Sequence, residues 1–190
     1  MMIAGVDEAG RGAWAGPVVA SAVIFLTKNI PKVADSKILS AKDRERLFGE
    51  IMEMSCVGVG IVSHEVIDSK GIRKATHMAM QNAVDGLSQI PGKLLIDGRD
   101  NFQFLLPHEY FVRGDTYINE ISAASIIAKV TRDRLMIEYG DKFENYGFAQ
   151  HKGYGTKVHQ TALKMYGPCG IHRRSYRPIG NLLQLGILTT

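Results

Sequence analysis

Acidic residues at the ends of short apolar segments are the feature that most constrains the fold of this chain. The apolar residues 2–6 run directly into Asp7 and Glu8. Two later candidate strands end close to Asp97 and Asp115. Strand ends at one edge of an α/β sheet are where segments distant in the sequence converge. The pattern therefore predicts that carboxylates from three parts of the chain meet at one edge of a sheet.

Apolar periodicity predicts strands that first cluster and then alternate with helices. The predicted strands are residues 2–6, 18–26, 57–63, 93–97, 102–106 and 110–112. The predicted helices are residues 41–54 behind the N-cap Ser40, then 72–87, 117–139, 157–165 and 181–188. Small residues at 122–125 predict that another backbone lies close to the longest helix. This order indicates an α/β fold, a mixed β-sheet flanked by helices with additional C-terminal helices.

Charge is divided unevenly along the 190 residues. The 23 Lys and Arg against 19 Asp and Glu give +4, yet every acid lies at or before Glu144. Residues 145–190 hold four of the seven Tyr and six basic residues, Lys152, Lys157, Lys164, Arg173, Arg174 and Arg177. This composition is typical of a surface that meets phosphates, although a solvated basic helix would share it. We expect a core at 1–145 and a basic helical extension at 146–190, packed as one compact domain.

The composition excludes several classes of protein. With 45% hydrophobic and 22% charged residues, the chain is too apolar for disorder. Its aliphatic stretch at 18–26 is too short for a membrane span, and charges come too early in residues 1–8 for a secretory signal. Cys56 and Cys169 make neither a disulfide framework nor a C-x-x-C motif. We expect a cytoplasmic monomer without membrane contact, with both cysteines in its core.

The four acids need a counter-charge if they meet. Carboxylates that share a site repel one another, and their pKa values rise unless a cation neutralises them. Hard divalent cations prefer such oxygen ligands, and no Cys or His cluster indicates zinc. Two such ions about 3.5–4 Å apart can stabilise the attacking and leaving oxygens of a phosphodiester. The acids thus favour phosphodiester chemistry with divalent cations.

Each acid also has a simpler interpretation. Asp7 or Asp97 alone could cap a helix or form a salt bridge. Asp115 could cap the longest predicted helix, because Asp is favoured at N-caps. Adjacent side chains of a strand point to opposite faces, so Asp7 and Glu8 share a site only if the chain bends. The glycines that follow them would allow such a bend.

Residues 7–12 read DEAGRG, which joins two carboxylates to a glycine-rich loop. Glycines on both sides of Arg11 let backbone N–H groups approach a ligand, and the guanidinium offers a planar fork to phosphate. The segment resembles the opening of type 2 ribonucleases H, specifically ribonuclease HII. Further segments match that family in order: DSKILS at 35–40, IDG at 96–98, GD at 114–115, SAASIIAK and TRD within 122–133, and HKGYGT at 151–156. Residues 13–15 depart from the family pattern, and Trp14 is expected to fill a local pocket.

The resemblance implies a ribonuclease H-like fold and an endonuclease. Such an enzyme cleaves the RNA strand of RNA–DNA hybrids and the 5′ side of single ribonucleotides in duplex DNA, leaving 5′-phosphate and 3′-hydroxyl ends. It would remove misincorporated ribonucleotides by two-metal-ion hydrolysis, with a metal-bound water as nucleophile. The resemblance assigns the catalytic and metal-binding roles, with Mg²⁺ or Mn²⁺, to Asp7, Glu8, Asp97 and Asp115.

The resemblance and the basic composition also indicate substrate contacts. The substrate-binding residues would be Gly10, Arg11, Gly12, Lys37, Lys152 and Tyr154. The glycine-rich triplet would recognise the region of the 2′-hydroxyl, and the tyrosine would pack on the sugar of the following deoxynucleotide. Both lysines would contact phosphates. The tyrosine could instead be a core residue, and each lysine could be solvated.

Other basic and titratable side chains receive weaker expectations. Arg173, Arg174 and Arg177 would extend the contact with the duplex, or the first two could form a basic turn. Asp133 is expected to pair with an arginine. His151 and His159 are expected at the surface or beside phosphate.

Two alternative functions stay open. Ribonuclease HIII shares this core but carries an additional N-terminal domain, for which the residues before Asp7 leave no room. A protein that only binds hybrids would need the basic segment but not four acids. The final residues 182–190 lack the paired aromatics of sliding-clamp ligands, so no clamp partner is expected.

Overall fold

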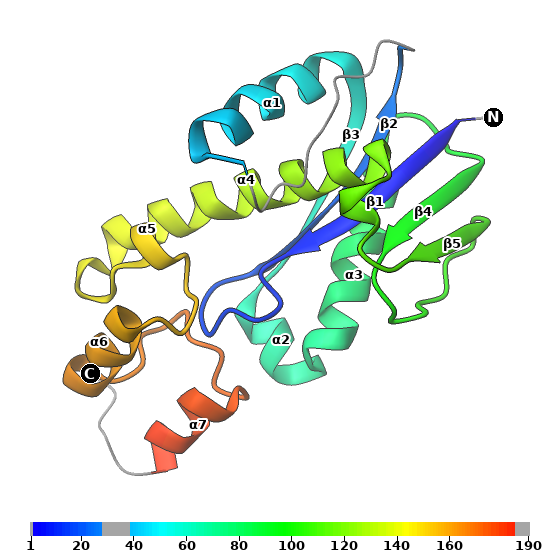
Figure 1. Ribbon diagram of the computed structural model, residues 1–190. Coiled ribbons are helices and arrows are strands. Elements are labelled where there is room, and N and C mark those ends of the chain that lie inside the picture. The colour runs from blue at the N-terminus through cyan, green and yellow to red at the C-terminus, as the bar shows by residue number, and fades with distance from the viewer. Residues whose placement is uncertain (1, 28–38, 185–190) are drawn as a thin grey trace.

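A five-stranded sheet forms the centre of the computed structural model, which describes residues 2–27 and 39–184 (Figure 1). The strands are β1 (Ile3–Ala9), β2 (Val18–Phe25), β3 (Ser55–Val62), β4 (Lys93–Asp97) and β5 (His108–Phe111). Their spatial order is β3-β2-β1-β4-β5. The pairs β1–β2 and β2–β3 are antiparallel, whereas β1–β4 and β4–β5 are parallel. The sheet is therefore mixed, as the sequence predicts.

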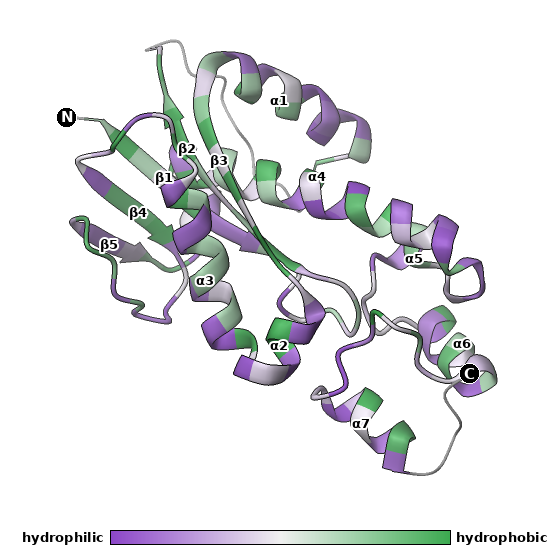
Figure 2. Cartoon of the chain, turned by 180° about the vertical axis from the view of Figure 1, so that it is seen from behind, coloured by the Kyte–Doolittle hydropathy of each residue, from purple (hydrophilic) through white to green (hydrophobic). Residues whose placement is uncertain are grey.

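Helices cover both faces of this sheet (Figure 1). On one face lie α1 (Ala41–Met54) and α4 (Asn119–Lys142), and on the other lie α2 (His64–Lys70) and α3 (Ile72–Asp85). The chain continues through α5 (Phe148–His151), α6 (Lys157–Tyr166) and α7 (Arg177–Gln184). Hydrophobic residues run along the central strands between the helical layers (Figure 2). Within the described ranges, no helix has the length and apolar character needed to cross a membrane.

Helix α4 lies close against the sheet because the residues at their contact are small. The Ser21 hydroxyl donates to the Ala124 carbonyl at 2.7 Å. A side chain at Gly5 would collide with the backbone of Glu120. Residues 121–128 are all buried, since the sheet covers one side of the helix and α1 the other. The close approach predicted from the small residues is confirmed.

Some limits of elements differ from the predicted ones. Residues 102–106 form no strand, because Phe102 and Phe104 pack their rings against His77 of α3 at 4.9 and 5.1 Å. Their alternation reflects two rings beneath a helix and not pairing in the sheet. The last helix is displaced toward the N-terminus from the predicted 181–188, and the residues after Gln184 lie outside the described part. The predicted N-cap Ser40 is confirmed, since its hydroxyl accepts from the N–H of Asp43 at 3.1 Å.

A third hydrophobic cluster joins the C-terminal helices to the rest of the molecule. Its buried residues include Ala15, Met136, Tyr146, Phe148, Leu163 and Ile179. Ala15 follows the glycine-rich loop and Met136 belongs to α4, so the chain after residue 145 packs on the loop that follows β1. The C-terminal segment thereby supports the part of the chain that carries the DEAGRG motif. The division at 145 and 146 stays a prediction.

Candidate active site

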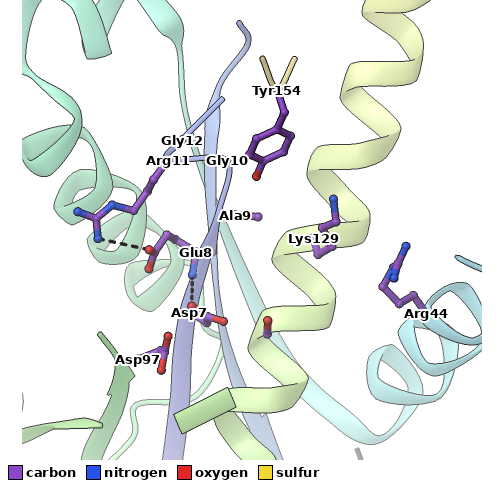
Figure 3. A pocket seen from close by; sticks show the side chains of 11 residues that line it. Asp7, Glu8, Ala9, Gly10, Arg11, Gly12, Arg44, Asp97, Lys129 and Tyr154 are labelled. Carbon is purple, nitrogen blue, oxygen red and sulfur yellow. Dashed lines mark hydrogen bonds and ion pairs between the residues drawn. The ribbon is translucent and has the colours of Figure 1, made fainter. Parts of the chain in front are cut away.

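A cavity of about 580 Å³ opens where β1 and β4 end (Figure 3). Seven of the ten predicted site residues line it, namely Asp7, Glu8, Gly10, Arg11, Gly12, Asp97 and Tyr154. Asp115 and Lys152 lie outside its lining, and Lys37 lies outside the described residues. The structure thus brings together segments that are separated by up to 147 residues.

Asp7 and Glu8 are neighbours near the end of β1, yet both line the cavity. The Asp7 side chain interacts with Ser125 of α4, whereas that of Glu8 approaches Arg11. The N–H of Glu8 donates to the Asp7 carboxylate at 2.7 Å (Figure 3). Gly10 has φ +95°, so the sharp turn comes after the two acids. The cavity reaches around the strand end, which is how two residues of opposite orientation share it.

Burial and mutual repulsion raise the pKa values of these two acids. For Asp7, burial raises the pKa well above its usual value, and the charges of Glu8 and Asp97 raise it further. For Glu8, burial raises the pKa to about 7 although Arg11 opposes this, and Asp97 adds to the increase. Such carboxylates gain more from a nearby cation than exposed ones do. The carboxylates at this strand edge therefore repel one another, as the sequence predicts, and a cation beside them would be stabilising.

Asp97 and Asp115 are linked through a tight turn. The Asp97 carboxylate accepts from the N–H of Gly114 at 2.7 Å. A side chain at Gly114 would press on Ile121 and Phe111, so glycine suits this close approach. Asp115 is 1% exposed in the 3₁₀ turn Gly114–Thr116, beside the acid that lines the cavity. Because α4 begins only at Asn119, after Ile118 as N-cap, the interpretation of Asp115 as its cap is wrong.

The glycine-rich loop and Tyr154 face one another at the cavity. A side chain at Gly10 would collide with the guanidinium of Arg132, which makes glycine necessary there. A Cβ at Gly12 would lie 4.0 Å from the Tyr154 ring, so the bare backbone of Gly12 borders that ring. Tyr154 is 37% exposed and lies 5.4 Å from the Arg132 guanidinium, so its interpretation as a core residue is wrong.

Arg11 and Lys152 both have partners inside the protein. The Arg11 guanidinium contacts Glu8 at 3.4 Å and forms a shorter ion pair with Asp100. The Lys152 amine donates to the carbonyl of Ala149, away from the cavity lining. Contact of either side chain with phosphate stays a prediction.

Besides Ala9 of the DEAGRG segment, three further residues line the cavity, and none of them is a predicted site residue. They are Arg44 of α1 and Ser125 and Lys129 of α4. The last two lie in the SAASIIAK segment, whose family resemblance is a usable signal, whereas Arg44 has none. Lys129 pairs with Asp133 at 2.7 Å, so the expected pairing of Asp133 with an arginine is wrong. The helical spacing of four residues explains the pair.

Two arginines are buried behind the glycine-rich loop. Arg132 donates to the carbonyls of Ala15, Pro17 and Lys152 at 2.9–3.1 Å. Arg173 donates to the carbonyls of Arg11, Gly16 and Pro17 at 2.9–3.0 Å. Because Arg173 is 0% exposed, the expectation that it extends the contact with a duplex is wrong. Arg174 and Arg177 are exposed, as a surface role requires.

Other expectations have mixed outcomes. His159 is buried, so its predicted place at the surface is wrong, whereas His151 is partly buried. Cys56 is buried and Cys169 partly so. Trp14 fills a local pocket, as predicted, because a side chain at Gly155 would collide with its ring.

The acids that line the cavity offer only oxygen ligands. Within residues 2–27 and 39–184, no three His, Cys, Asp or Glu side chains are grouped closely enough to hold an ion as they stand. The chemistry of the set still fits a hard divalent cation, because Asp7, Glu8 and Asp97 are all carboxylates with restricted solvent access. Raised pKa values at the first two show that a positive charge there would be favourable.

Comparison with known proteins extends these observations to the whole chain. The family model described as Ribonuclease HII matches residues 4–178. The chain belongs to the ribonuclease HII family. Ribonuclease HII of Geobacter metallireducens is 50% identical over 179 residues, 93% of this chain and 84% of that protein. Ribonuclease HII of Leuconostoc mesenteroides is 49% identical over 184 residues, 96% of this chain and 72% of that protein.

Solved structures agree with this membership of the ribonuclease HII family. Ribonuclease H2 of Pyrococcus horikoshii has a TM-score of 0.83 at 28% identity, covering 97% of this chain and 98% of that one. A ribonuclease HIII solved with Mn²⁺ has a TM-score of 0.75 at 17% identity, covering 97% of this chain and 70% of that one, and shares the fold. The ribonuclease H-like fold is confirmed. The protein is a ribonuclease H, an endonuclease that depends on divalent metal and cleaves RNA in RNA–DNA hybrids.

Proposed function

We propose that this ribonuclease HII also cuts on the 5′ side of single ribonucleotides embedded in duplex DNA and thereby removes misincorporated ribonucleotides. The observation that carries the proposal is the meeting of three carboxylates, the glycine-rich loop and Tyr154 at one cavity. A single ribonucleotide differs from its neighbours only at the 2′-hydroxyl, which both donates and accepts hydrogen bonds. The backbone of Gly10 and Gly12 and the flat ring of Tyr154 can both contact that one sugar closely.

The acids would hold Mg²⁺ or Mn²⁺, two ions per site, with Asp7, Glu8 and Asp97 from the cavity lining and Asp115 from the adjoining turn. Bound divalent ions supply positive charge to the attacking and leaving oxygens of the phosphodiester. The carboxylates themselves repel the nucleic-acid backbone, so substrate binding and cation binding are coupled at this site. Cleavage would leave 5′-phosphate and 3′-hydroxyl ends.

The substrate would be recognised by the backbone of the glycine-rich loop, by the Tyr154 ring and by basic side chains at the cavity. Gly10 and Gly12 leave the loop backbone accessible beside the sugar, and Tyr154 packs on the sugar of the following deoxynucleotide, where no 2′-hydroxyl intervenes. Lys129 and Arg44 line the same cavity and add positive charge to it. Lys37 and Lys152 are further proposed phosphate contacts. These groups bind and orient the strand relative to the acids.

The basic chain after residue 145 would extend the binding surface. Lys157, Lys164, Arg174 and Arg177 are exposed there, and exposed cations close to a duplex strengthen binding in a salt-dependent way. We propose a cytoplasmic monomer without a clamp partner. Ribonuclease HII of Archaeoglobus fulgidus, solved in complex with PCNA, has a TM-score of 0.82 at 28% identity and covers 93% of this chain and 96% of that one.

A direct test uses a DNA duplex with one ribonucleotide, incubated with the folded protein and Mg²⁺ or Mn²⁺. We expect one cut on the 5′ side of the ribonucleotide, with a 5′-phosphate on the downstream product. An all-DNA duplex is the matched control and should stay intact. An uncut ribonucleotide strand, beside cleavage of a long hybrid by the same sample, would contradict the proposal.

A further inference from the structure

Three histidines form a cluster behind Tyr154, outside the cavity lining, and two of them are buried. His159 and His172 are 0% and 1% exposed, and the His151 ring stacks on that of His159 at 4.5 Å. Phe148, Tyr146 and Trp14 surround them, with ring centroids within 5.7 Å of one or another imidazole. A buried imidazole is costly unless its two nitrogens find partners. The partners of these nitrogens show which main-chain groups the cluster binds.

Hydrogen bonds to the main chain determine the proton positions on both buried rings. His159 Nδ1 lies 3.0 Å from the Tyr154 carbonyl, which can only accept, so Nδ1 carries the proton and Nε2 accepts. His172 Nδ1 lies 2.8 Å from the N–H of Cys169, which can only donate, so Nδ1 accepts and Nε2 carries the proton. The Cys169 carbonyl is more distant from that nitrogen, at 3.3 Å.

The two assignments agree where the rings meet. His159 Nε2 and His172 Nε2 are 2.9 Å apart, and the main-chain contacts make the first an acceptor and the second a donor. The hydrogen bonds therefore run in one direction, from the Cys169 N–H through both imidazoles to the Tyr154 carbonyl. Burial lowers the pKa of His159 to about 4 and that of His172 to about 3, which keeps both rings neutral as this chain requires.

His151 holds the residue on the other side of Tyr154. Its Nε2 lies 2.7 Å from the Tyr146 carbonyl and therefore donates, while its Nδ1 accepts from the N–H of Gly153 at 3.2 Å. The backbone around Tyr154 is thus fixed by imidazoles on both sides. The ring itself lines the cavity and lies 5.4 Å from the Arg132 guanidinium.

We propose that His159 and His172 are positioning residues that hold Tyr154 at the substrate, so that the discrimination of a ribonucleotide–deoxynucleotide junction depends on them. This inference rests on the proposed function of Tyr154. In the described part of the chain, neither His159 nor His172 lines the cavity with the acids, so they act through the tyrosine and not through cation binding. The C-terminal segment that supplies His172 contributes in this way to specificity.

Histidine variants can separate the two hydrogen bonds. The amide nitrogen of Asn superposes on Nδ1, so His159→Asn keeps a donor for the Tyr154 carbonyl and loses the bond to His172. The longer Gln places its amide near Nε2, so His159→Gln keeps an acceptor for His172 and loses the bond to Tyr154. His77→Gln is a control for the substitution itself, because His77 lies outside the site and Gln keeps a donor near Nε2 for the Gln103 carbonyl, 3.0 Å from that nitrogen.

The measurement is kcat/KM on a single-ribonucleotide duplex and on a long RNA–DNA hybrid. We expect His159→Gln to lower the ratio of the first to the second about tenfold, the scale of one buried hydrogen bond. His159→Asn should restore most of that ratio, and His77→Gln should leave it unchanged. In a Tyr154→Ala background, His159→Gln should change the ratio little further, because coupled residues are not additive.

Each other outcome has a definite meaning. Equal losses on both substrates, or additive effects of His159→Gln and Tyr154→Ala, would mean a general loss of structure and overturn the inference. An unchanged ratio in Tyr154→Ala alone would overturn both the inference and the proposed role of the tyrosine. Long-range ¹H–¹⁵N spectra at pH 7 should show Nδ1–H on His159 and Nε2–H on His172. The opposite tautomers would contradict the hydrogen-bond chain even if a variant failed to fold.

Discussion

Asp97 connects two parts of the acidic site, since it lines the cavity and also accepts from the turn that carries Asp115. We expect Asp97→Asn to preserve binding of a hybrid while cleavage falls about 100-fold or more, because an amide is a poor ligand for a hard divalent cation. Binding by fluorescence anisotropy and cleavage rates with Mg²⁺ would measure both. Asp85→Asn on α3 serves as a control. Cleavage at the wild-type rate in Asp97→Asn would remove this acid from the site.

Gly10 lies at φ +95° against the Arg132 guanidinium. We expect Gly10→Ala to lower the free energy of unfolding by at least about 1 kcal/mol, since a side chain at positive φ is strained and would displace the arginine. Cleavage of hybrids should fall with it. Urea unfolding and cleavage rates would test this.

Gly49 provides the matched control for Gly10. It lies inside α1 with open space where a Cβ would go, so Gly49→Ala should raise stability by up to about 1 kcal/mol. Similar losses in both variants would show that the positive φ of Gly10 has no special importance.

Sequence reasoning succeeds at single residues where a chemical type is rare in its surroundings. Carboxylates directly after an apolar strand stand out, and Asp7, Glu8 and Asp97 are found at one cavity as predicted. Arg173 shows the opposite case. The sequence does not distinguish an arginine that donates to three buried carbonyls from an arginine on a basic surface. The partners of Arg173 are main-chain groups, which leave no pattern in the sequence.

At the scale of elements, α1 and β4 have the predicted bounds, 41–54 and 93–97, and α4 is the most consequential element. Its small residues indicate a close backbone, and the sheet does lie against it. Residues 102–106 fail because two rings beneath α3 alternate just as a strand would. The bend that the two acids were expected to need comes at Gly10, one of the glycines that follow them. Periodicity reports which residues are covered and does not identify the covering element.

His159 and His172 connect the turn between α5 and α6 to the segment before α7. The stability that this connection provides should depend on pH. The pKa of His159 is lowered in the folded protein to about 4, whereas an unfolded histidine titrates near 6.5. Between these values the unfolded chain binds more protons, so the contribution of His159 to stability falls as the pH is lowered from 7 toward 4.

We therefore compare wild type with His159→Asn, whose amide does not titrate. Lowering the pH from 7 to 5 should cost the wild type about 2 kcal/mol more free energy of unfolding than it costs the variant. Urea unfolding with a chelator at both pH values would measure this, and the shared carboxylates cancel in the difference. An equal pH dependence in both proteins would show that His159 does not titrate as its burial requires.

For the whole molecule, the uneven charge leads to the clearest prediction, that the basic C-terminal segment contacts the substrate. Four exposed basic residues of the C-terminal segment are available to a duplex, but Arg173 is structural, so the basic segment has two tasks. Removing everything after Asn145 would also remove six of the eight buried residues of the third hydrophobic cluster. Point variants are needed to separate binding from folding.

We expect the double variant Lys157→Gln and Lys164→Gln to flatten the salt dependence of hybrid binding, by up to about 0.9 in log Kd per log salt for each lost phosphate contact. Lys70→Gln with Lys74→Gln, on α2 and α3, removes the same charge elsewhere. Binding titrations at several salt concentrations would compare them. Equal slopes for the two double variants would show that the C-terminal charges have no special place on the substrate.

The bonds from Arg173 to the glycine-rich loop span up to 162 residues of chain. Contacts so distant in sequence close late, since a long loop must be ordered before they form. During synthesis the DEAGRG segment leaves the ribosome first. The arginines that contact it, Arg132 and then Arg173, are synthesised much later. An incomplete chain therefore has the acids but no finished loop to select a substrate.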